Sequence, residues 1–340
     1  MKVTGAMINK EIRLVGRING FFMNILFCHE RVLYMTRKLA KSVLTRSKSN
    51  KLDNNGVFIE KRNGGNVRAC IYKPFDPIEK AVGVLWIHGG GYAIGAPEMD
   101  IGYFEKLIST TGCVIVSPDY TLSTEKPYPA ALEDCYEALL WMKDNSSILG
   151  IRDDQLFVCG VSAGGGLTAA VTILARDKGE VSIAFQMPLY PMIDDIMGTE
   201  SARDNNAPIW NSKSNKLGWK MYLKGLSGSS SVPKYAAPSR ETDFTRLPPT
   251  YTFVGDIEPF YNETIAYIEN LQKAGVQAKA DVYEGCYHAF DIMCPGAEVS
   301  KRAVSRMLDE FKYAVDNHFS RQAEIDIEPS NCIAVIARVL

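Results

Sequence analysis

A serine with glycines two positions away on either side stands at position 162, in the G-x-S-x-G pentapeptide of residues 160–164. A short apolar run rich in strand formers precedes it (155–159), and a small-residue segment typical of a helix follows it (167–175). A sharp turn between strand and helix would expose the serine, and glycines permit that turn because they carry no Cβ atom. The context predicts a nucleophilic Ser162, although the pentapeptide alone also fits an ordinary connecting loop.

A serine hydroxyl needs a base to accept its proton, and the base needs a third group to orient it. When the chain order is serine, acid, histidine, the histidine follows the final strand. Only His288 and His318 lie downstream of Ser162. His318 ends a predicted helix, where the helix dipole accounts for it. His288 comes directly after a predicted strand and is therefore the predicted base.

The orienting acid is expected after the preceding strand, where Asp256 and Glu258 both occur. Glu263 falls within the next predicted helix, and we expect it to be solvated. The residues themselves do not separate Asp256 from Glu258, because both are carboxylates at the carboxyl end of one strand.

A run of three glycines, residues 89–91, follows His88 at the end of a predicted central strand. Glycines let the backbone approach a ligand, and each N–H group aimed at a developing oxyanion contributes about 3 kcal/mol. Gly89, Gly90 and Ala163 are predicted to supply these donors. His88 is expected to order the loop through hydrogen bonds. The Lys-Ser/Thr of a phosphate-binding P-loop is missing from this run.

The elements that must position these residues alternate between strand and helix, which predicts a mostly parallel sheet with helices on both faces, an α/β fold. A hairpin signal at Asn63-Gly-Gly joins the first two expected strands. The expected strands cover residues 57–62, 67–72, 82–87, 113–117, 155–159, 183–189, 249–254 and 278–283. The expected helices cover about 98–111, 128–144, 167–175, 260–274 and 297–317.

Three segments interrupt the alternation of strands and helices. Residues 1–50 carry ten Lys and Arg against two Glu, a formal charge of +8, with apolar residues at amphipathic-helix spacing. Such a helix can lie on an anionic membrane, but packing against the main domain is favoured. Residues 192–232 are polar and dotted with aromatics, as expected of a lid or cap. The apolar tail, 319–340, fits either an extra strand or a disordered end.

Composition narrows the class of protein. The chain has 340 residues, 46% of them hydrophobic, and a net charge of −1, which gives no sign of a nucleic-acid partner. Its eight cysteines form no C-x-x-C pair and no metal-ligand spacing, so we expect reduced, buried thiols, a cytoplasmic protein and no metal. No segment is long enough to span a bilayer, and the apolar stretch 20–27 lacks a cleavage site. The oligomeric state stays open, and a homo-oligomer is compatible with the sequence.

Four motifs in order resemble the hormone-sensitive-lipase-like carboxylesterases, which are α/β hydrolases. They are His88-Gly-Gly-Gly-Tyr92, Asp119-Tyr-Thr-Leu122 with Tyr128-Pro-Ala-Ala131, Gly160-Val-Ser-Ala-Gly-Gly165, and Leu247-Pro-Pro249 with His288. The resemblance runs from about residue 65 to 317. It implies a core of residues 51–191 and 233–318, with a cap from residues 1–50 and 192–232. It also implies Glu258 as the acid, because Glu258-Pro-Phe-Tyr-Asn-Glu263 aligns on the family's Asp-Pro-Leu-x-Asp-Glu.

The chain departs from the family pattern at three positions. Val161 replaces the usual Asp before the serine, Thr121 replaces an Arg, and Glu258 replaces an Asp. The first two remove charges near the serine, so the support of these loops must differ. The longer acid is one that the fold accommodates.

The resemblance implies a serine carboxylesterase for small or short-acyl esters that needs no cofactor. Ser162 would attack, His288 would carry the proton and Glu258 would hold the histidine, with Asp256 as the alternative acid. Tyr92, Trp210, Trp219 and Phe22 are expected to line the substrate pocket. The alternatives are a deacetylase of sugars or drugs, a peptidase, or a binding protein on the same scaffold. The retained His288 argues against the last of these.

Overall fold

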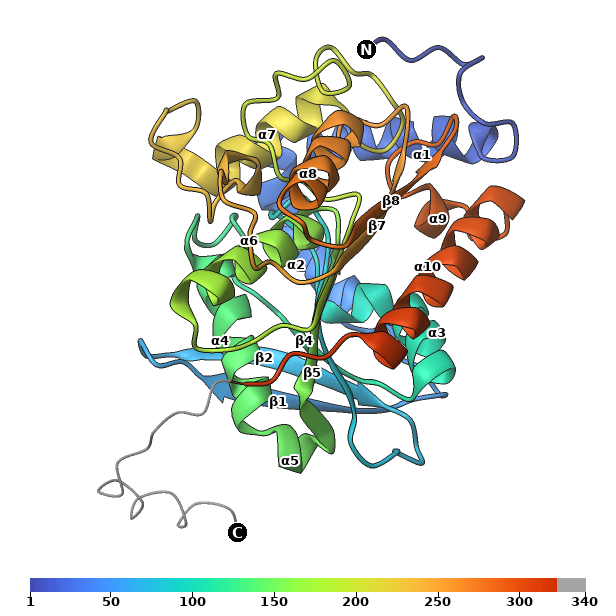
Figure 1. The fold of residues 1–340 in the computed structure, drawn as a ribbon. Coiled ribbons are helices and arrows are strands. Elements are labelled where there is room, and N and C mark those ends of the chain that lie inside the picture. Colours follow the sequence, from blue (N-terminus) through green and yellow to red (C-terminus); the bar gives the residue numbers. More distant parts are fainter. Residues whose placement is uncertain (323–340) are drawn as a thin grey trace.

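The computed structural model describes residues 1–322, which are built around one eight-stranded sheet (Figure 1). The strand order is β1-β2-β4-β3-β5-β6-β7-β8, and all neighbours from β4 to β8 pair in parallel. The strands are β1 Asp53–Glu60, β2 Asn66–Lys73, β3 Ala81–Ile87, β4 Val114–Pro118, β5 Ile151–Val161, β6 Phe185–Leu189, β7 Thr250–Gly255 and β8 Ala278–Tyr283. The predicted α/β class is confirmed, and the sheet is parallel except at the β1–β2 hairpin and its pairing with β4.

Helices cover both faces of the sheet, with α4, α6 and α8 on one side and α3 and α10 on the other (Figure 1). The helices are α1 Arg13–Phe27, α2 Glu30–Leu44, α3 Ile101–Thr111, α4 Ala130–Asp144, α5 Ser146–Leu149, α6 Ala163–Lys178, α7 Ser212–Leu223, α8 Tyr261–Lys273, α9 Phe290–Met293 and α10 Glu298–Asn317. Short 3₁₀ turns lie at Pro97–Asp100, Lys224–Leu226 and Pro238–Arg240. This sandwich places the carboxyl ends of the central strands at one edge, where ligands bind in parallel sheets.

Strand β3 explains why the sheet needs cover on both faces. Every residue of β3 is buried. Leu85 and Ile87 join the apolar cluster on the α4–α6 side, whereas Val84 and Trp86 join the cluster on the α3–α10 side. Successive side chains of a strand point to opposite faces, so a continuous apolar run is typical of a strand buried on both.

The N-terminal 50 residues form two helices, and one face of α1 packs on the rest of the chain. Its buried positions are Gly16, Gly20 and Phe27. A Cβ atom on Gly16 would lie 2.4 Å from the Tyr287 ring, and one on Gly20 would lie 3.2 Å from Pro208. The small residues therefore let α1 lie directly on these two segments, as expected for a helix that covers part of the main domain.

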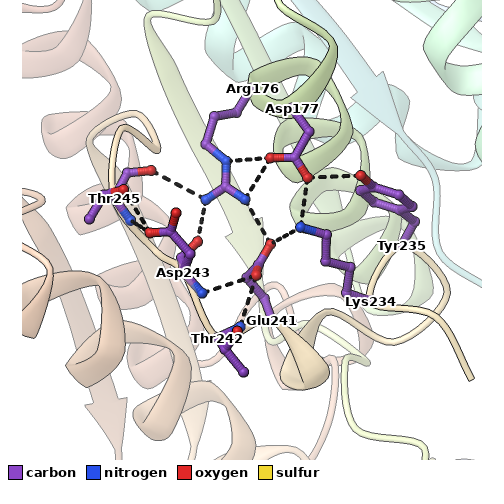
Figure 2. Close-up of polar contacts among 8 residues, drawn as sticks. All are labelled: Arg176, Asp177, Lys234, Tyr235, Glu241, Thr242, Asp243 and Thr245. Carbon is purple, nitrogen blue, oxygen red and sulfur yellow. Dashed lines mark hydrogen bonds and ion pairs between the residues drawn. The ribbon is translucent and has the colours of Figure 1, made fainter.

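Charged side chains fasten the loop after α7 to the end of α6 (Figure 2). The Arg176 guanidinium, 5% exposed, binds Glu241 at 2.7 Å and Asp177 at 2.8 Å. Lys234 reaches the same two carboxylates at 2.9 and 2.7 Å. Hydrogen bonds from Thr242 and Asp243 backbone N–H groups complete the shell of Glu241. A buried carboxylate with this many donors fixes the return of the chain from α7 to the sheet.

Several smaller expectations can be compared with the described residues. All seven cysteines among them are free, and no helix in this part of the chain is long and apolar enough to cross a bilayer. Residues 319–322 run beside the start of β5, where the Ser320 N–H donates to the Asp154 carbonyl at 2.8 Å. The rest of the C-terminal tail, residues 323–340, lies outside the described residues.

Candidate active site

Ser162 occupies a strained turn between β5 and α6. Its φ of 58° and ψ of −120° are rare for a residue with a side chain, and such outliers cluster at active sites. Two glycines make the turn feasible, because a Cβ atom would lie 2.6 Å from the Ile87 carbonyl oxygen at Gly160 and 2.0 Å from it at Gly164. The turn holds the Ser162 hydroxyl at the carboxyl end of the central strand.

His288 follows β8 and reaches Ser162 across the sheet edge. Its Nε2 lies 2.8 Å from the Ser162 Oγ, and its Nδ1 contacts the Glu258 carboxylate. The ring is 4% exposed and meets the rings of Phe260 and Tyr190 edge-on at centroid distances of 4.9 and 5.1 Å. Nδ1 bound to a carboxylate leaves Nε2 free to accept the serine proton.

The two candidate acids diverge after β7. Glu258 is fully buried, and its second oxygen accepts the Gly255 N–H at 3.0 Å. Asp256 instead accepts the Gly285 N–H at 2.7 Å, and burial raises the pKa of its carboxyl. The structure therefore brings Ser162, His288 and Glu258 together and leaves Asp256 in a loop-to-loop contact.

Glu263 is buried, so the expectation of a solvated side chain is wrong. It is 3% exposed, and one of its oxygens accepts the backbone N–H groups of Ile193 and Asp194 at 2.8 and 3.2 Å. Burial raises the pKa of its carboxyl well above the usual range. The expectation failed because the segment after β6 folds back over the first turn of α8.

The glycine run after β3 lies beside the serine. An added Cβ atom on Gly89 would be 3.4 Å from that of Ser162. Gly90 and Gly91 have φ values of +113° and +61°, which favour glycine. Ala163 is the first residue of α6, so its N–H has no partner within the helix. These backbone groups can face a negative charge that develops next to the serine.

His88 orders this glycine run, as expected. Its Nδ1 donates to the Gly89 carbonyl at 2.8 Å, and its ring stacks on Tyr120 at 4.2 Å. The Tyr120 hydroxyl donates to the His88 carbonyl at 3.0 Å. Burial lowers the pKa of His88 to about 4, so its ring is neutral at neutral pH.

The two departures from the family pattern near the serine fall in buried surroundings. Val161 is 2% exposed and packs in the apolar cluster on the α3–α10 side. The Thr121 N–H donates to Asp134 at 2.8 Å, and Lys61 pairs with the same carboxylate at 2.8 Å. Asp119 is held instead by Lys41 and Arg68. Asp119 and Asp134 are therefore each paired with a lysine from outside the motif, Lys41 and Lys61 respectively.

Of the four predicted pocket residues, Trp210 lies beside the His288 ring. Trp210 is 6.3 Å from the His288 ring, and its indole would contact a Cβ atom on Gly91. The Tyr92 ring stacks on Tyr222 at 4.0 Å and its hydroxyl donates to the Met192 carbonyl, so these contacts are packing contacts, and its role in the pocket stays a prediction. Trp219 packs against the same two tyrosines.

Phe22 is 63% exposed on α1, so its role in the pocket also stays a prediction. Sequence reasoning missed Tyr190 and Phe260, which contact the His288 ring. Tyr190 follows β6 at the same sheet edge, so its position after a central strand is the signal that would have found it. No cluster of three His, Cys, Asp or Glu side chains that could hold a metal occurs in residues 1–322.

Comparisons with known proteins agree with this geometry. A sequence model described as alpha/beta hydrolase fold matches residues 84–292. An arylesterase of Saccharolobus solfataricus is 29% identical over 228 residues, which cover 65% of this chain and 71% of that protein. Carboxylesterase NlhH of Mycobacterium tuberculosis is 29% identical over 235 residues, 68% of this chain and 73% of its own.

The solved structure of a bacterial heroin esterase superposes with a TM-score of 0.81 at 28% identity. It covers 92% of this chain and 99% of its own. The family match extends over more than half of the chain and includes every residue from the glycine run to His288. The chain therefore belongs to the hormone-sensitive-lipase-like carboxylesterase group of the α/β-hydrolase family.

Proposed function

We propose that the protein is a serine carboxylesterase acting on small or short-acyl esters through an acyl-enzyme intermediate. The observation that carries the proposal is the chain of contacts from Ser162 through His288 to Glu258. A relative named arylesterase and another named carboxylesterase support an ester substrate.

In the proposed reaction, the Ser162 Oγ attacks the ester carbonyl carbon while its proton passes to the His288 Nε2. The carbonyl oxygen becomes an oxyanion, which the N–H groups of Gly89, Gly90 and Ala163 stabilise. Collapse of this intermediate breaks the carbon–oxygen bond, and the leaving alcohol takes the proton from His288. Water then attacks the acyl-enzyme by the same route and releases the acid.

Glu258 holds the His288 ring in the tautomer with a proton on Nδ1 and stabilises the cation that forms. The rings of Trp210, Phe260 and Tyr190 surround His288, and Ser162 is 8% exposed. This crowding favours a short acyl group. We also assign residues 1–50 and 192–232 to a cap over the site, because α1 lies against Pro208 and its Asn24 pairs with Asn211.

The Ser162→Ala variant tests the proposal with p-nitrophenyl butyrate. We expect kcat to fall by about 10⁶-fold, as when a nucleophile is removed from such a triad, and labelling by a fluorophosphonate to disappear. Ser109→Ala is the matched control, because that hydroxyl bonds only its own helix carbonyl at Lys106. Wild-type turnover in Ser162→Ala overturns the proposal. Faster turnover of an acetylated sugar or an aminoacyl amide than of the ester assigns the same site to a deacetylase or a peptidase.

A further inference from the structure

Large apolar side chains are exposed along both N-terminal helices. On α1 they recur at spacings of three to four residues, and on α2 they recur every fourth residue. They are 46–82% exposed and comprise Leu14, Ile18, Phe21, Phe22, Ile25, Met35, Leu39 and Val43. We refer to these eight residues as the N-terminal apolar face. Such spacing places each set along one side of its helix.

The apolar face is the side of α1 that its packing on the protein does not use. Its opposite side buries Gly16 on the Tyr287 ring and Gly20 on Pro208. Apolar residues scattered singly on a surface are ordinary, but contiguous exposed sets mark sites of interaction. The expectation that α1 folds against the main domain therefore accounts for only half of its apolar residues.

Two grooves meet at the junction between the two helices. One groove, of about 430 Å³, is lined on the N-terminal segment by Phe21, Asn24, Ile25, Cys28 and His29, and by Asn205, Asn206, Asn211 and Lys213 of the segment before and at the start of α7. A second, of about 790 Å³, shares Cys28 and His29 and continues to Met35. Cys28 and His29, which line both grooves, thus connect Phe21 and Ile25 of α1 with Met35 of α2.

Positive charge flanks this surface. Arg17, Arg31 and Lys38 are exposed, and in the described part of the chain none of the three forms an ion pair. The two acids of residues 1–50 are engaged, since Glu30 pairs with Lys220 and Glu11 accepts the Val299 N–H. Residues 1–50 carry a formal charge of +8, which leaves −9 for the other 290 residues.

We propose that the N-terminal apolar face docks on an anionic lipid surface. Helices with an apolar side and flanking basic residues lie in the membrane interface, where the apolar side enters about 5–10 Å and the cations meet lipid headgroups. An anionic lipid surface meets both features at once, because its headgroups are negative and its acyl chains are apolar.

This placement brings the bilayer close to the candidate active site. The face of α1 opposite the lipid touches Tyr287, the neighbour of His288. A helix with its side chains is about 10 Å across, so one helix would separate the lipid surface from the loop that carries His288. Esters dissolved in the membrane would therefore be concentrated within a short distance of the site. This last step rests on the proposed function, whereas lipid binding does not.

Vesicle co-sedimentation of the full chain tests the proposal, with phosphatidylcholine alone and with added phosphatidylserine. We expect binding to the mixed vesicles that high salt weakens. M35S/L39S/V43S is expected to lower the partition at least about tenfold by removing apolar contact. R31Q/K38Q is expected to lower it by about 30-fold at low salt, because each basic residue near such a surface contributes about 1 kcal/mol.

Two matched controls separate this face from the rest of the surface. Ile148 is 83% exposed and Lys312 is exposed on α10, so I148S and K312Q should bind vesicles like the wild type. Thermal melting verifies that every variant is folded. Because vesicle binding needs no turnover, it can succeed or fail independently of the esterase activity.

Three results overturn the proposal. They are absence of binding to the mixed vesicles, equal binding to neutral and anionic vesicles, and wild-type binding by M35S/L39S/V43S. A wild-type dimer that these substitutions dissociate, without any vesicle binding, assigns the face to a second copy of the chain instead.

Discussion

The Glu258 carboxylate accepts the Nδ1–H of His288, while its other oxygen is held by the Gly255 N–H at 3.0 Å. Asp256, two residues earlier, turns to the Gly285 N–H at 2.7 Å. Two carboxylates at the end of one strand thus have separate tasks. Glu258 orients the histidine, and Asp256 ties the loop after β7 to the loop after β8.

Substitution of each acid by its amide separates these tasks. Glu258→Gln should lower kcat about 10³–10⁴-fold, because an amide favours the wrong histidine tautomer. Asp256→Asn keeps an oxygen for the Gly285 N–H and should change kcat less than about tenfold. Steady-state kinetics with p-nitrophenyl butyrate measure both. A larger loss in Asp256→Asn would assign the orienting role to Asp256.

Gly90→Ala should distort the backbone of the glycine run, residues 89–91. The new Cβ atom would lie 1.9 Å from the Ile94 carbonyl oxygen, at a φ of +113° that strains any side chain. We expect kcat to fall more than about 10²-fold, as for loss of one oxyanion donor, together with a lower Tm.

Gly102→Ala is the control for that substitution. No atom lies within 4 Å of the added Cβ, and the residue is the second of helix α3, where alanine is favoured over glycine by up to about 1 kcal/mol. Its Tm should rise and its kcat should stay unchanged. Wild-type kinetics in Gly90→Ala would exclude its N–H from oxyanion binding.

The ionisation of Glu263 should lower the stability of the folded protein as pH rises. An acid that forms an ion pair has the opposite effect. Burial raises the pKa of the Glu263 carboxyl, so its contribution is present below about pH 4.3 and is lost as pH rises toward the folded-state pKa. Glu263→Gln keeps an acceptor for the Ile193 and Asp194 N–H groups and cannot ionise. It should be more stable than the wild type at pH 8, with a smaller difference at pH 4.

The matched variant Glu263→Ala leaves both N–H groups without an acceptor and should cost about 1–3 kcal/mol of unfolding free energy. Urea denaturation across this pH range measures both variants. Equal pH slopes in the wild type and Glu263→Gln would show that Glu263 is ionised in the folded protein.

Asp177 should affect the stability of the folded protein at acidic pH. Burial opposes its ionisation, but hydrogen bonds from Lys234, Tyr235 and Arg176 outweigh this and lower its pKa to about 2 (Figure 2). Its contribution to stability is then present above about pH 4 and lost as pH falls toward 2. Asp177→Asn should flatten the decline of the urea midpoint between these pH values. An unchanged slope would refute the role of this cluster.

The sequence predicted the arrangement of the site better than its surroundings. Ser162, His288 and the glycine run each follow a strand, and parallel strands bring their carboxyl ends to one edge. Local residue types therefore sufficed to predict that these groups meet. The choice between Asp256 and Glu258 depended on where Gly285 lies, which no local pattern encodes.

The pocket could not be predicted in this way. An aromatic residue after a glycine run is equally compatible with a pocket or a core, and Tyr92 is buried because Tyr222 of α7 stacks on it. Glu263 looked solvated because the segment that covers it, residues 193–194, lies about 70 residues earlier in the chain. Such burial follows from tertiary packing between distant segments, which helical periodicity does not report.

The reactivity of the buried free cysteines can show which part of the fold opens. Burial raises the pKa of Cys113 to about 12 and also raises that of Cys286, so neither thiol reacts readily while it is covered. Cys113 precedes a central strand, whereas Cys286 lies two residues before His288. The rate at which a thiol reagent modifies Cys286 therefore reports how often the loop that carries His288 opens. The rate at which it modifies Cys113 reports how often the sheet opens. Comparing the two separates local breathing at the site from global unfolding in one unlabelled protein.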